Sequence, residues 1–133
     1  MIMDSPLDDQ IPLPEGELIS QLITSPNDGN IYGDIYAGWL INHMDAAGAY
    51  LASQLARGRV TTVAVGSMVF LKPVPTGNSI SFYAQCQEIK RSSMRIYVEV
   101  WLREENQAIS KVTEGEFVFV AIDNQGRTRS IDQ

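Results

Sequence analysis

The sequence of 133 residues has the length of one folding domain, and its hydrophobic fraction of 44% and charged fraction of 20% exclude a chain that is disordered throughout. The net charge of −6 argues against a nucleic-acid partner. No apolar run approaches the roughly 20 residues that span a bilayer, so we expect no membrane partner.

Residues 1–16 contain three prolines and four acidic residues without a sustained hydrophobic period, which predicts a flexible N-terminal arm. Residues 17–133 are expected to form a single domain. Because the acidic, proline-containing start is unlike a secretory signal peptide, we expect a cytoplasmic protein. Residues 17–24 are predicted to form a short strand, which ends at the turn-forming residues 25–30.

One long helix is predicted over residues 37–57, where proline is absent and Gly58 follows as a stop signal. Its apolar positions recur at spacings of three or four residues: Leu40, Met44, Ala47, Leu51 and Leu55. The middle of the helix, residues 46–49 together with Ala52, consists of alanine and glycine. Side chains this small predict that another element packs very close to the helix.

Four strands are predicted after the helix, because four segments alternate with period two and are rich in β-branched or aromatic residues: 60–71, 79–89, 94–103 and 112–122. The short turn-like separators favour an antiparallel meander. A flat sheet would leave much of the long helix exposed, so the expected fold class is α+β, with a curved antiparallel sheet of five to six strands wrapped around one long central helix.

Several kinds of catalytic site are disfavoured by the residue inventory. His43 is the only histidine and Cys86 the only cysteine, so one subunit cannot supply the usual ligands of a zinc site, and we expect no metal. Cys86 lies in an alternating segment and is interpreted as a small core residue rather than a reactive thiol. His43 lies in the predicted helix without a strained nucleophile turn nearby, which disfavours a Ser-His-Asp arrangement.

Asp45 is a carboxylate in a part of the predicted helix that otherwise lacks charge. An ionised carboxylate away from water costs several kcal/mol unless it has a partner. Two interpretations are therefore equally favoured by the residue pattern. Asp45 is either a general base in a site, or a residue that is solvated or paired with a base from elsewhere in the chain.

The segment before the helix, residues 30–39, brings Gly33 and Gly38 to the helix start, where free N–H groups point outward with a partial positive charge. Such a turn can hold an oxyanion. The alternative is simple helix initiation, with glycines that are needed for packing.

Basic residues are concentrated in the middle of the chain, where residues 57–95 hold six bases against Glu88 alone. The six are Arg57, Arg59, Lys72, Lys90, Arg91 and Arg95. They are either solvated turn and edge residues or a local site for phosphates.

The order and spacing of eight residues around the helix start resemble hotdog-fold acyl-CoA thioesterases of the YciA type: Asn30, Gly33, Asp34, Ile35, Gly38, Trp39, Met44 and Asp45. The resemblance continues in order at 58–60, 70–74, 98–101 and 120–127, and covers residues 18–130. The chain departs from the family pattern at Ala37, where a second glycine is usual, and at Tyr32, where a smaller polar residue is common. Both departures bear on the expected substrate range.

The resemblance implies the hotdog fold and an enzyme that hydrolyses acyl-CoA to free CoA and a carboxylic acid. Asp45 would then activate water or attack the thioester carbon, Asn30 from the other subunit would orient water or the carbonyl, and the N–H of Gly38 would receive the oxyanion. The family forms homo-oligomers, with dimers joined sheet edge to sheet edge and often hexameric trimers of dimers. No cofactor is implied, because CoA is part of the substrate.

The same resemblance implies a function for the basic segment, residues 57–95, because CoA carries a diphosphate and a ribose phosphate that basic residues can bind. The expected substrate-binding residues are Arg59, Lys90 and Arg91, with Ser92 and Ser93 as hydroxyl donors. The alternative function is a non-catalytic acyl-CoA-binding or assembly module, which would keep the fold and the basic segment but would not need Asp45.

Overall fold

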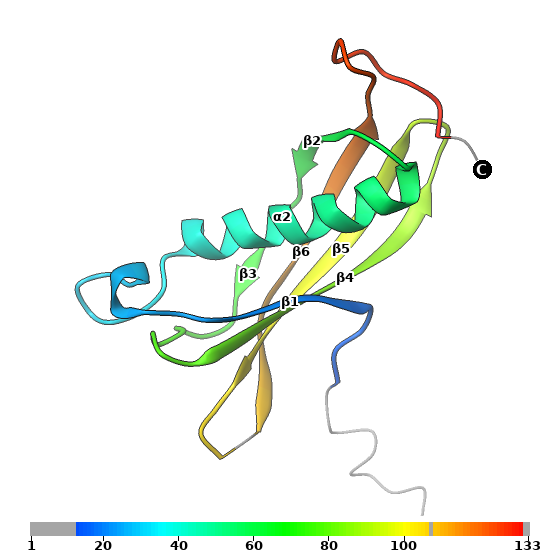
Figure 1. The fold of residues 1–133 in the computed structure, drawn as a ribbon. Coiled ribbons are helices and arrows are strands. Elements are labelled where there is room, and N and C mark those ends of the chain that lie inside the picture. The colour runs from blue at the N-terminus through cyan, green and yellow to red at the C-terminus, as the bar shows by residue number, and fades with distance from the viewer. Residues whose placement is uncertain (1–12, 107, 132–133) are drawn as a thin grey trace, which may run out of the picture.

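The computed structural model describes residues 13–106 and 108–131. Its elements follow one another as β1 (Glu17–Ile23), the 3-10 turn η1 (Pro26–Asp28), α2 (Ala37–Ala56), β2 (Val60–Val65), β3 (Val69–Phe70), β4 (Ser79–Ile89), β5 (Ser93–Arg103) and β6 (Ile109–Ala121). The six strands form one antiparallel sheet that curves around α2 (Figure 1). The expected α+β architecture is confirmed. Most of the predicted flexible arm, up to residue 12, lies outside the described residues.

The helix α2 begins at Ala37 as predicted and ends at Ala56, because Arg57 adopts the left-handed conformation (φ 53°) and its N–H bonds back to the last turn. The buried face differs from the prediction in its second half, where Leu51 and Leu55 are only partly buried. The fully buried residues of the helix are Leu40, Met44, Ala47, Gly48, Ala52 and Ala56. Small side chains, rather than the leucines, therefore face the sheet there.

The middle of α2 packs against β5 and β6 at close range. A Cβ atom placed on Gly48 would lie 3.0 Å from Cε2 of Phe119 and 3.4 Å from Cγ2 of Val98. The predicted close packing is confirmed, and its physical reason is that only a residue without a side chain leaves room for the Phe119 ring.

The strand order in the sheet is β1-β4-β5-β6-β2, with β3 also paired to β6. The predicted meander is therefore correct only for β4, β5 and β6. The predicted strand 60–71 is interrupted at 66–68 and lies beyond β6, so the chain crosses the sheet between β3 and β4. On this crossing Val74 is buried, and its carbonyl accepts a hydrogen bond from the N–H of Ile35 just before α2 (2.8 Å).

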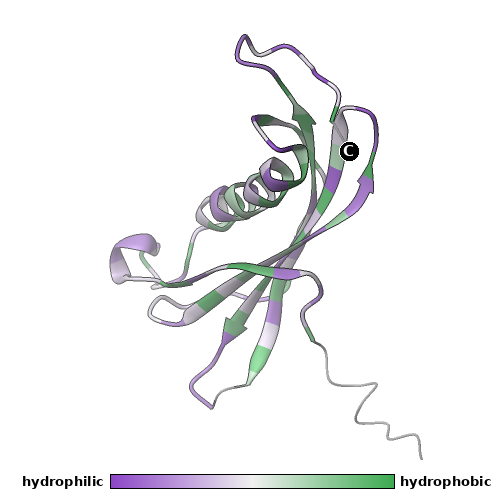
Figure 2. Ribbon diagram, turned by 45° about the vertical axis from the view of Figure 1, so that its right-hand side comes forward, coloured by the Kyte–Doolittle hydropathy of each residue, from purple (hydrophilic) through white to green (hydrophobic). Residues whose placement is uncertain are grey.

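The hydrophobic core lies between α2 and the concave face of the sheet, and the hairpin turns at the two ends of the sheet are hydrophilic (Figure 2). Cys86 is half-buried and packs against this core, and burial raises the pKa of its thiol. Within residues 13–106 and 108–131, no helix is long and apolar enough to cross a membrane, and no group of three His, Cys, Asp or Glu side chains could hold a metal ion. The cytoplasmic location stays a prediction.

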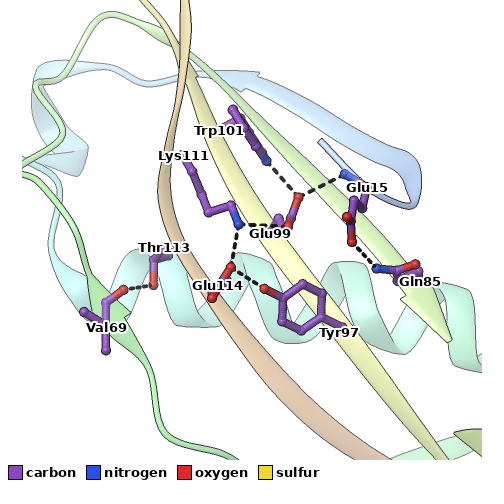
Figure 3. Close-up of polar contacts among 9 residues, drawn as sticks. All are labelled: Glu15, Val69, Gln85, Tyr97, Glu99, Trp101, Lys111, Thr113 and Glu114. Atoms are coloured by element: carbon purple, nitrogen blue, oxygen red, sulfur yellow. Dashed lines mark hydrogen bonds and ion pairs between the residues drawn. The ribbon is translucent and has the colours of Figure 1, made fainter. Parts of the chain in front are cut away.

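A charged network lies on the face of the sheet that points away from α2 (Figure 3). Glu99 is its centre, with a side chain only 3% exposed. The Glu99 carboxylate accepts hydrogen bonds from Nε1 of Trp101 (3.0 Å) and from the main-chain N–H of Glu15 (3.1 Å), and it pairs with Nζ of Lys111 (3.1 Å). The residues just before β1 are thereby attached to β5.

Lys111 also pairs with Glu114 (2.6 Å), which accepts a second hydrogen bond from the Tyr97 hydroxyl. Burial alone would lower the pKa of the Lys111 ammonium, but hydrogen bonds to Glu114 and Glu99 outweigh this and raise it. The Lys111 hydrogen bond, followed by that of Tyr97, lowers the pKa of Glu114.

The lowered pKa of Glu114 predicts a loss of stability in acid. A carboxyl whose pKa is lower in the folded than in the unfolded protein stabilises the fold above its unfolded pKa, here 4.5, and loses that contribution as the pH falls through the folded pKa. We expect the free energy of unfolding to fall below about pH 5 in the native protein, and to fall less steeply in Glu114→Gln. Urea unfolding at a series of pH values would measure both slopes. Equal slopes would contradict the prediction.

Candidate active site

Asp45 lies on α2 with its half-buried side chain turned toward β2. Its Oδ1 accepts a hydrogen bond from Oγ1 of Thr62 on β2, at 2.6 Å. Within the described parts of the chain, none of the ion pairs includes Asp45. The carboxylate is therefore held by one neutral hydroxyl, and its other oxygen, Oδ2, is left to accept a further hydrogen bond.

Thr62 was not singled out from the sequence, although a weak signal was present. It is half-buried between exposed Thr61 and Val63, so it is a polar residue at a position of β2 that faces inward. Its partner lies 17 residues away on another element, and no local pattern connects the two positions.

Asn30 lies in the loop between η1 and α2, where it fixes the backbone. Its Oδ1 accepts hydrogen bonds from the N–H groups of Tyr32 (2.8 Å) and Asp34 (3.1 Å), and its own N–H donates to the Asp34 carbonyl (2.7 Å). Because the amide oxygen is occupied, the NH₂ group of Asn30 is the part that is left to contact a ligand.

Gly38 is the second residue of α2 and is exposed, with no heavy atom within 4 Å of where its Cβ would be. Tyr36, the residue just before α2, provides no side-chain cap, and its carbonyl accepts hydrogen bonds from the N–H groups of Trp39 and Leu40. For the N–H groups of Ala37 and Gly38 there is no acceptor among the residues that the structure covers. The helix therefore begins with two free donors, aligned with the positive end of its dipole.

Asp45 and Gly38 are not brought together within one chain. They are seven residues apart on α2, which corresponds to about 10 Å along the helix axis. One carbonyl group cannot be in hydrogen-bond contact with both. The structure therefore does not place both groups around one carbonyl within a single chain.

The basic residues that were predicted to bind phosphates lie at the other end of the molecule, where α2 ends. The main-chain carbonyls of Arg59 and Ser92 accept hydrogen bonds from Ile122 (3.0 Å) and Ala121 (2.8 Å) at the end of β6. Arg59 and the β4–β5 turn therefore flank the same strand end, about two strand spacings or 10 Å apart.

Lys90 lies in the β4–β5 turn, and its N–H donates to the carbonyl of Ser93, the first residue of β5 (2.8 Å). Arg91, between them, donates from Nε to Oγ of Ser130 (3.1 Å).

His43 lies on the opposite flank of α2 from Asp45. Its ring packs on Trp39, with centroids 4.1 Å apart, and it faces β1 across a pocket of about 410 Å³. A second pocket, of about 350 Å³, lies beside the start of α2 and is lined mainly by apolar residues, among them Ile35, Leu40 and Phe70. The position of His43 agrees with a packing role.

The sequence also matches a known family. The model of the thioesterase superfamily matches residues 32–109, which is more than half of the chain. The chain belongs to the thioesterase superfamily.

Relatives within this superfamily cover most of the chain. An uncharacterized acyl-CoA thioester hydrolase of Haemophilus influenzae is 45% identical over 88% of this chain and 79% of its own length. The acyl-CoA thioester hydrolase YciA of Escherichia coli is 40% identical over 90% of this chain and 93% of its own length. Among solved structures, a hexameric broad-specificity acyl-coenzyme A thioesterase is 42% identical, with a TM-score of 0.87 over 92% of this chain and 85% of its own. The expected hotdog fold is confirmed.

One more distant solved structure has been studied in single-residue variants. An acyl-CoA hydrolase of Staphylococcus aureus is 25% identical, with a TM-score of 0.79 over 84% of this chain, and it has been characterised with one aspartate or one threonine replaced by alanine. The two replaced positions are 17 residues apart, which is also the separation of Asp45 and Thr62.

Proposed function

We propose that this chain hydrolyses acyl-CoA thioesters to free CoA and a carboxylic acid, with Asp45 as the residue that activates water or attacks the thioester carbon. The observation that carries the proposal is the half-buried Asp45 carboxylate, oriented by Thr62 at 2.6 Å and without a cation among the described residues. A fixed hydroxyl on Oδ1 leaves Oδ2 as the oxygen that takes the proton of water or forms the new bond to carbon. The proposed reaction consumes water and needs no cofactor.

The developing oxyanion would be received by the N–H of Gly38, next to the free N–H of Ala37 at the start of α2. Donors that are already oriented toward the growing charge contribute a few kcal/mol of transition-state stabilisation. The NH₂ group of Asn30 would orient the water or the thioester carbonyl, since its amide oxygen is already occupied.

A homo-oligomer is part of the proposal, because one chain holds Asp45 too far from Gly38. Each active site would combine Asp45 of one subunit with Asn30 and Gly38 of another. The edge strand β2 supports this, since Val63 and Val65 expose about half of their surface beside Thr62. Joining two such edges would continue the sheet and cover the valines. We propose the dimer as the minimum and a hexameric trimer of dimers as the full assembly.

The phosphates of CoA would bind at the end of the sheet where α2 ends, with Arg59, Lys90 and Arg91 as cations and Ser92 and Ser93 as hydroxyl donors. This end lies about 18 Å from Asp45 along the helix, counted over twelve residues. The pantetheine arm of CoA, when extended, spans a gap of this size. The acyl chain would enter the apolar pocket beside the start of α2.

Thiol release from a panel of acyl-CoA substrates of increasing chain length tests the proposal. We expect each turnover to produce one free thiol and one carboxylic acid. Tight acyl-CoA binding without thiol release would contradict it and would favour a non-catalytic acyl-CoA-binding module.

Thr62 provides a separate test of how Asp45 is held. A hydrogen bond to a charged group contributes about 1.5–3 kcal/mol, so Thr62→Ala is expected to lower kcat by roughly 10- to 100-fold. Thr62→Ser keeps the hydroxyl and should retain most of the activity. Steady-state kinetics on both variants would decide, and an unchanged kcat in Thr62→Ala would exclude a role for this hydrogen bond.

A further inference from the structure

Arg129 has an unusual place for a cation near the end of the chain. Its Nε donates to the carbonyl of Ile122 (2.9 Å), and its Nη2 donates to the carbonyls of Ala56 (3.1 Å) and Arg59 (3.4 Å). One planar guanidinium group thereby ties the last residue of α2, the turn before β2 and the segment after β6. A cation at this point also complements the negative end of the helix dipole.

The turn between α2 and β2 is in direct contact with this guanidinium group. A Cβ atom on Gly58 would lie 2.7 Å from Nη2 of Arg129, so a glycine is needed for the contact. The Arg59 carbonyl accepts hydrogen bonds from Arg129 and from the N–H of Ile122, and Nη1 of Arg59 donates to the carbonyl of Asn124 (3.3 Å). Arg129 therefore contributes to the position of Arg59.

The two residues after Arg129 hold the second basic turn. Oγ of Ser130 accepts a hydrogen bond from Nε of Arg91 (3.1 Å), and the N–H of Ile131 donates to the Arg91 carbonyl (2.8 Å). Three consecutive residues, 129–131, therefore contact both of the turns that carry the arginines of the proposed phosphate subsite.

We propose that Arg129 is a positioning residue for CoA recognition, which sets the spacing of Arg59 and Arg91 without itself binding the phosphates. The proposal rests on the proposed function, because the phosphate subsite belongs to it. Two of the three guanidinium nitrogens of Arg129 are already used by three main-chain carbonyls. Among the described residues, the exposed Arg59 and Arg91 each use only one nitrogen, Nη1 to the carbonyl of Asn124 (3.3 Å) and Nε to Oγ of Ser130 (3.1 Å). The effect of Arg129 is therefore on where the two other cations lie.

The test compares an acyl-CoA with the matching acyl-pantetheine, which has the same thioester but no phosphates. In Arg129→Met we expect KM for acyl-CoA to rise on the order of tenfold, the equivalent of about 1.4 kcal/mol, with kcat changed less than twofold. KM for acyl-pantetheine should stay as in the native enzyme. Arg129→Lys should behave like Arg129→Met, because an ammonium group keeps the charge but cannot span the three carbonyls.

The matched control is Arg127→Met, which removes the same charge from the same segment, two residues away. Arg127 is exposed and pairs with Asp123 (3.2 Å). The KM values of Arg127→Met for both substrates should therefore equal those of the native enzyme. Ser130→Ala is a milder second variant, in which Arg91 loses one contact and KM for acyl-CoA should rise by a smaller factor. Circular dichroism and thermal unfolding establish that each variant is folded.

The outcomes separate the two proposals. Equal increases of KM for both substrates, a native KM in Arg129→Lys, or unchanged kinetics in both Arg129→Met and Ser130→Ala would overturn the positioning role. Absence of thiol release in the native enzyme would instead overturn the proposed function. If the native enzyme has equal KM values for acyl-CoA and acyl-pantetheine, the phosphates do not contribute to binding. That result would overturn both the phosphate subsite and the positioning role of Arg129.

Discussion

Replacing Asp45 by asparagine is expected to lower kcat for acyl-CoA hydrolysis by about 10²–10⁴-fold, the contribution of a positioned base. Asparagine has the same shape and its Oδ1 still accepts the hydrogen bond from Thr62, but its NH₂ group replaces Oδ2 and cannot take a proton from water. Because only the reacting oxygen changes, KM should change far less than kcat. Thiol release under saturating substrate measures the effect.

The double variant Asp45→Asn/Thr62→Ala is the control for this prediction. Thr62 is expected to act through Asp45, so the double variant should lose no more activity than Asp45→Asn alone. Additive losses would mean that the two residues act independently. An Asp45→Asn variant that is folded and retains more than about a tenth of the native kcat would rule out the base.

Replacing Lys111 by methionine is expected to lower the free energy of unfolding by about 3 kcal/mol, the cost of leaving a buried charge without its partner. Lys111 is the cation paired with Glu99, whose side chain is 3% exposed. Methionine keeps most of the length and the apolar stem of lysine. Urea unfolding at pH 7 measures the loss. In Lys111→Met/Glu99→Gln, where no buried charge remains, most of the stability should return.

Lys72 provides the matched control for this second prediction. It pairs with Glu104 at the same N–O distance of 3.1 Å, but the two side chains are 34% and 47% exposed. An exposed ion pair contributes about 0–1 kcal/mol, so Lys72→Met should cost much less than Lys111→Met. Equal losses would mean that burial of Glu99 is not what makes the inner pair important.

The elements of this fold follow from local patterns, and their arrangement follows only in part. The period of the apolar residues gave the start of α2 and the bounds of β4, because helix and strand periodicity are local properties. The interruption of strand 60–71 and its pairing with β6 were missed. Gly66 and Ser67 are a weak local signal for the interruption. The pairing with β6 depends on which edge of the sheet is free when the chain returns, and the residues of the strand do not encode this.

The candidate site shows the same division. Asp45 was found because a lone charge in an apolar helical stretch is visible in the sequence, and the family and enzyme class followed from the resemblance around it. Thr62 and Arg129 were missed. Each makes hydrogen bonds to residues that are distant in the sequence, and threonine or arginine alone carries no signal of its partner. The roles of Asp45, Asn30, Gly38 and the basic residues are proposals.

The attachment of the residues before β1 has a practical consequence for protein engineering. Glu99 receives the main-chain N–H of position 15, not a side chain, so eighteen of the nineteen possible exchanges at that position leave the donor in place. Proline is the exception, since it has no N–H. A spacer that joins an upstream affinity tag or fusion partner can therefore keep this contact with any residue except proline at position 15, although glutamate there also accepts the hydrogen bond from Gln85 (3.2 Å).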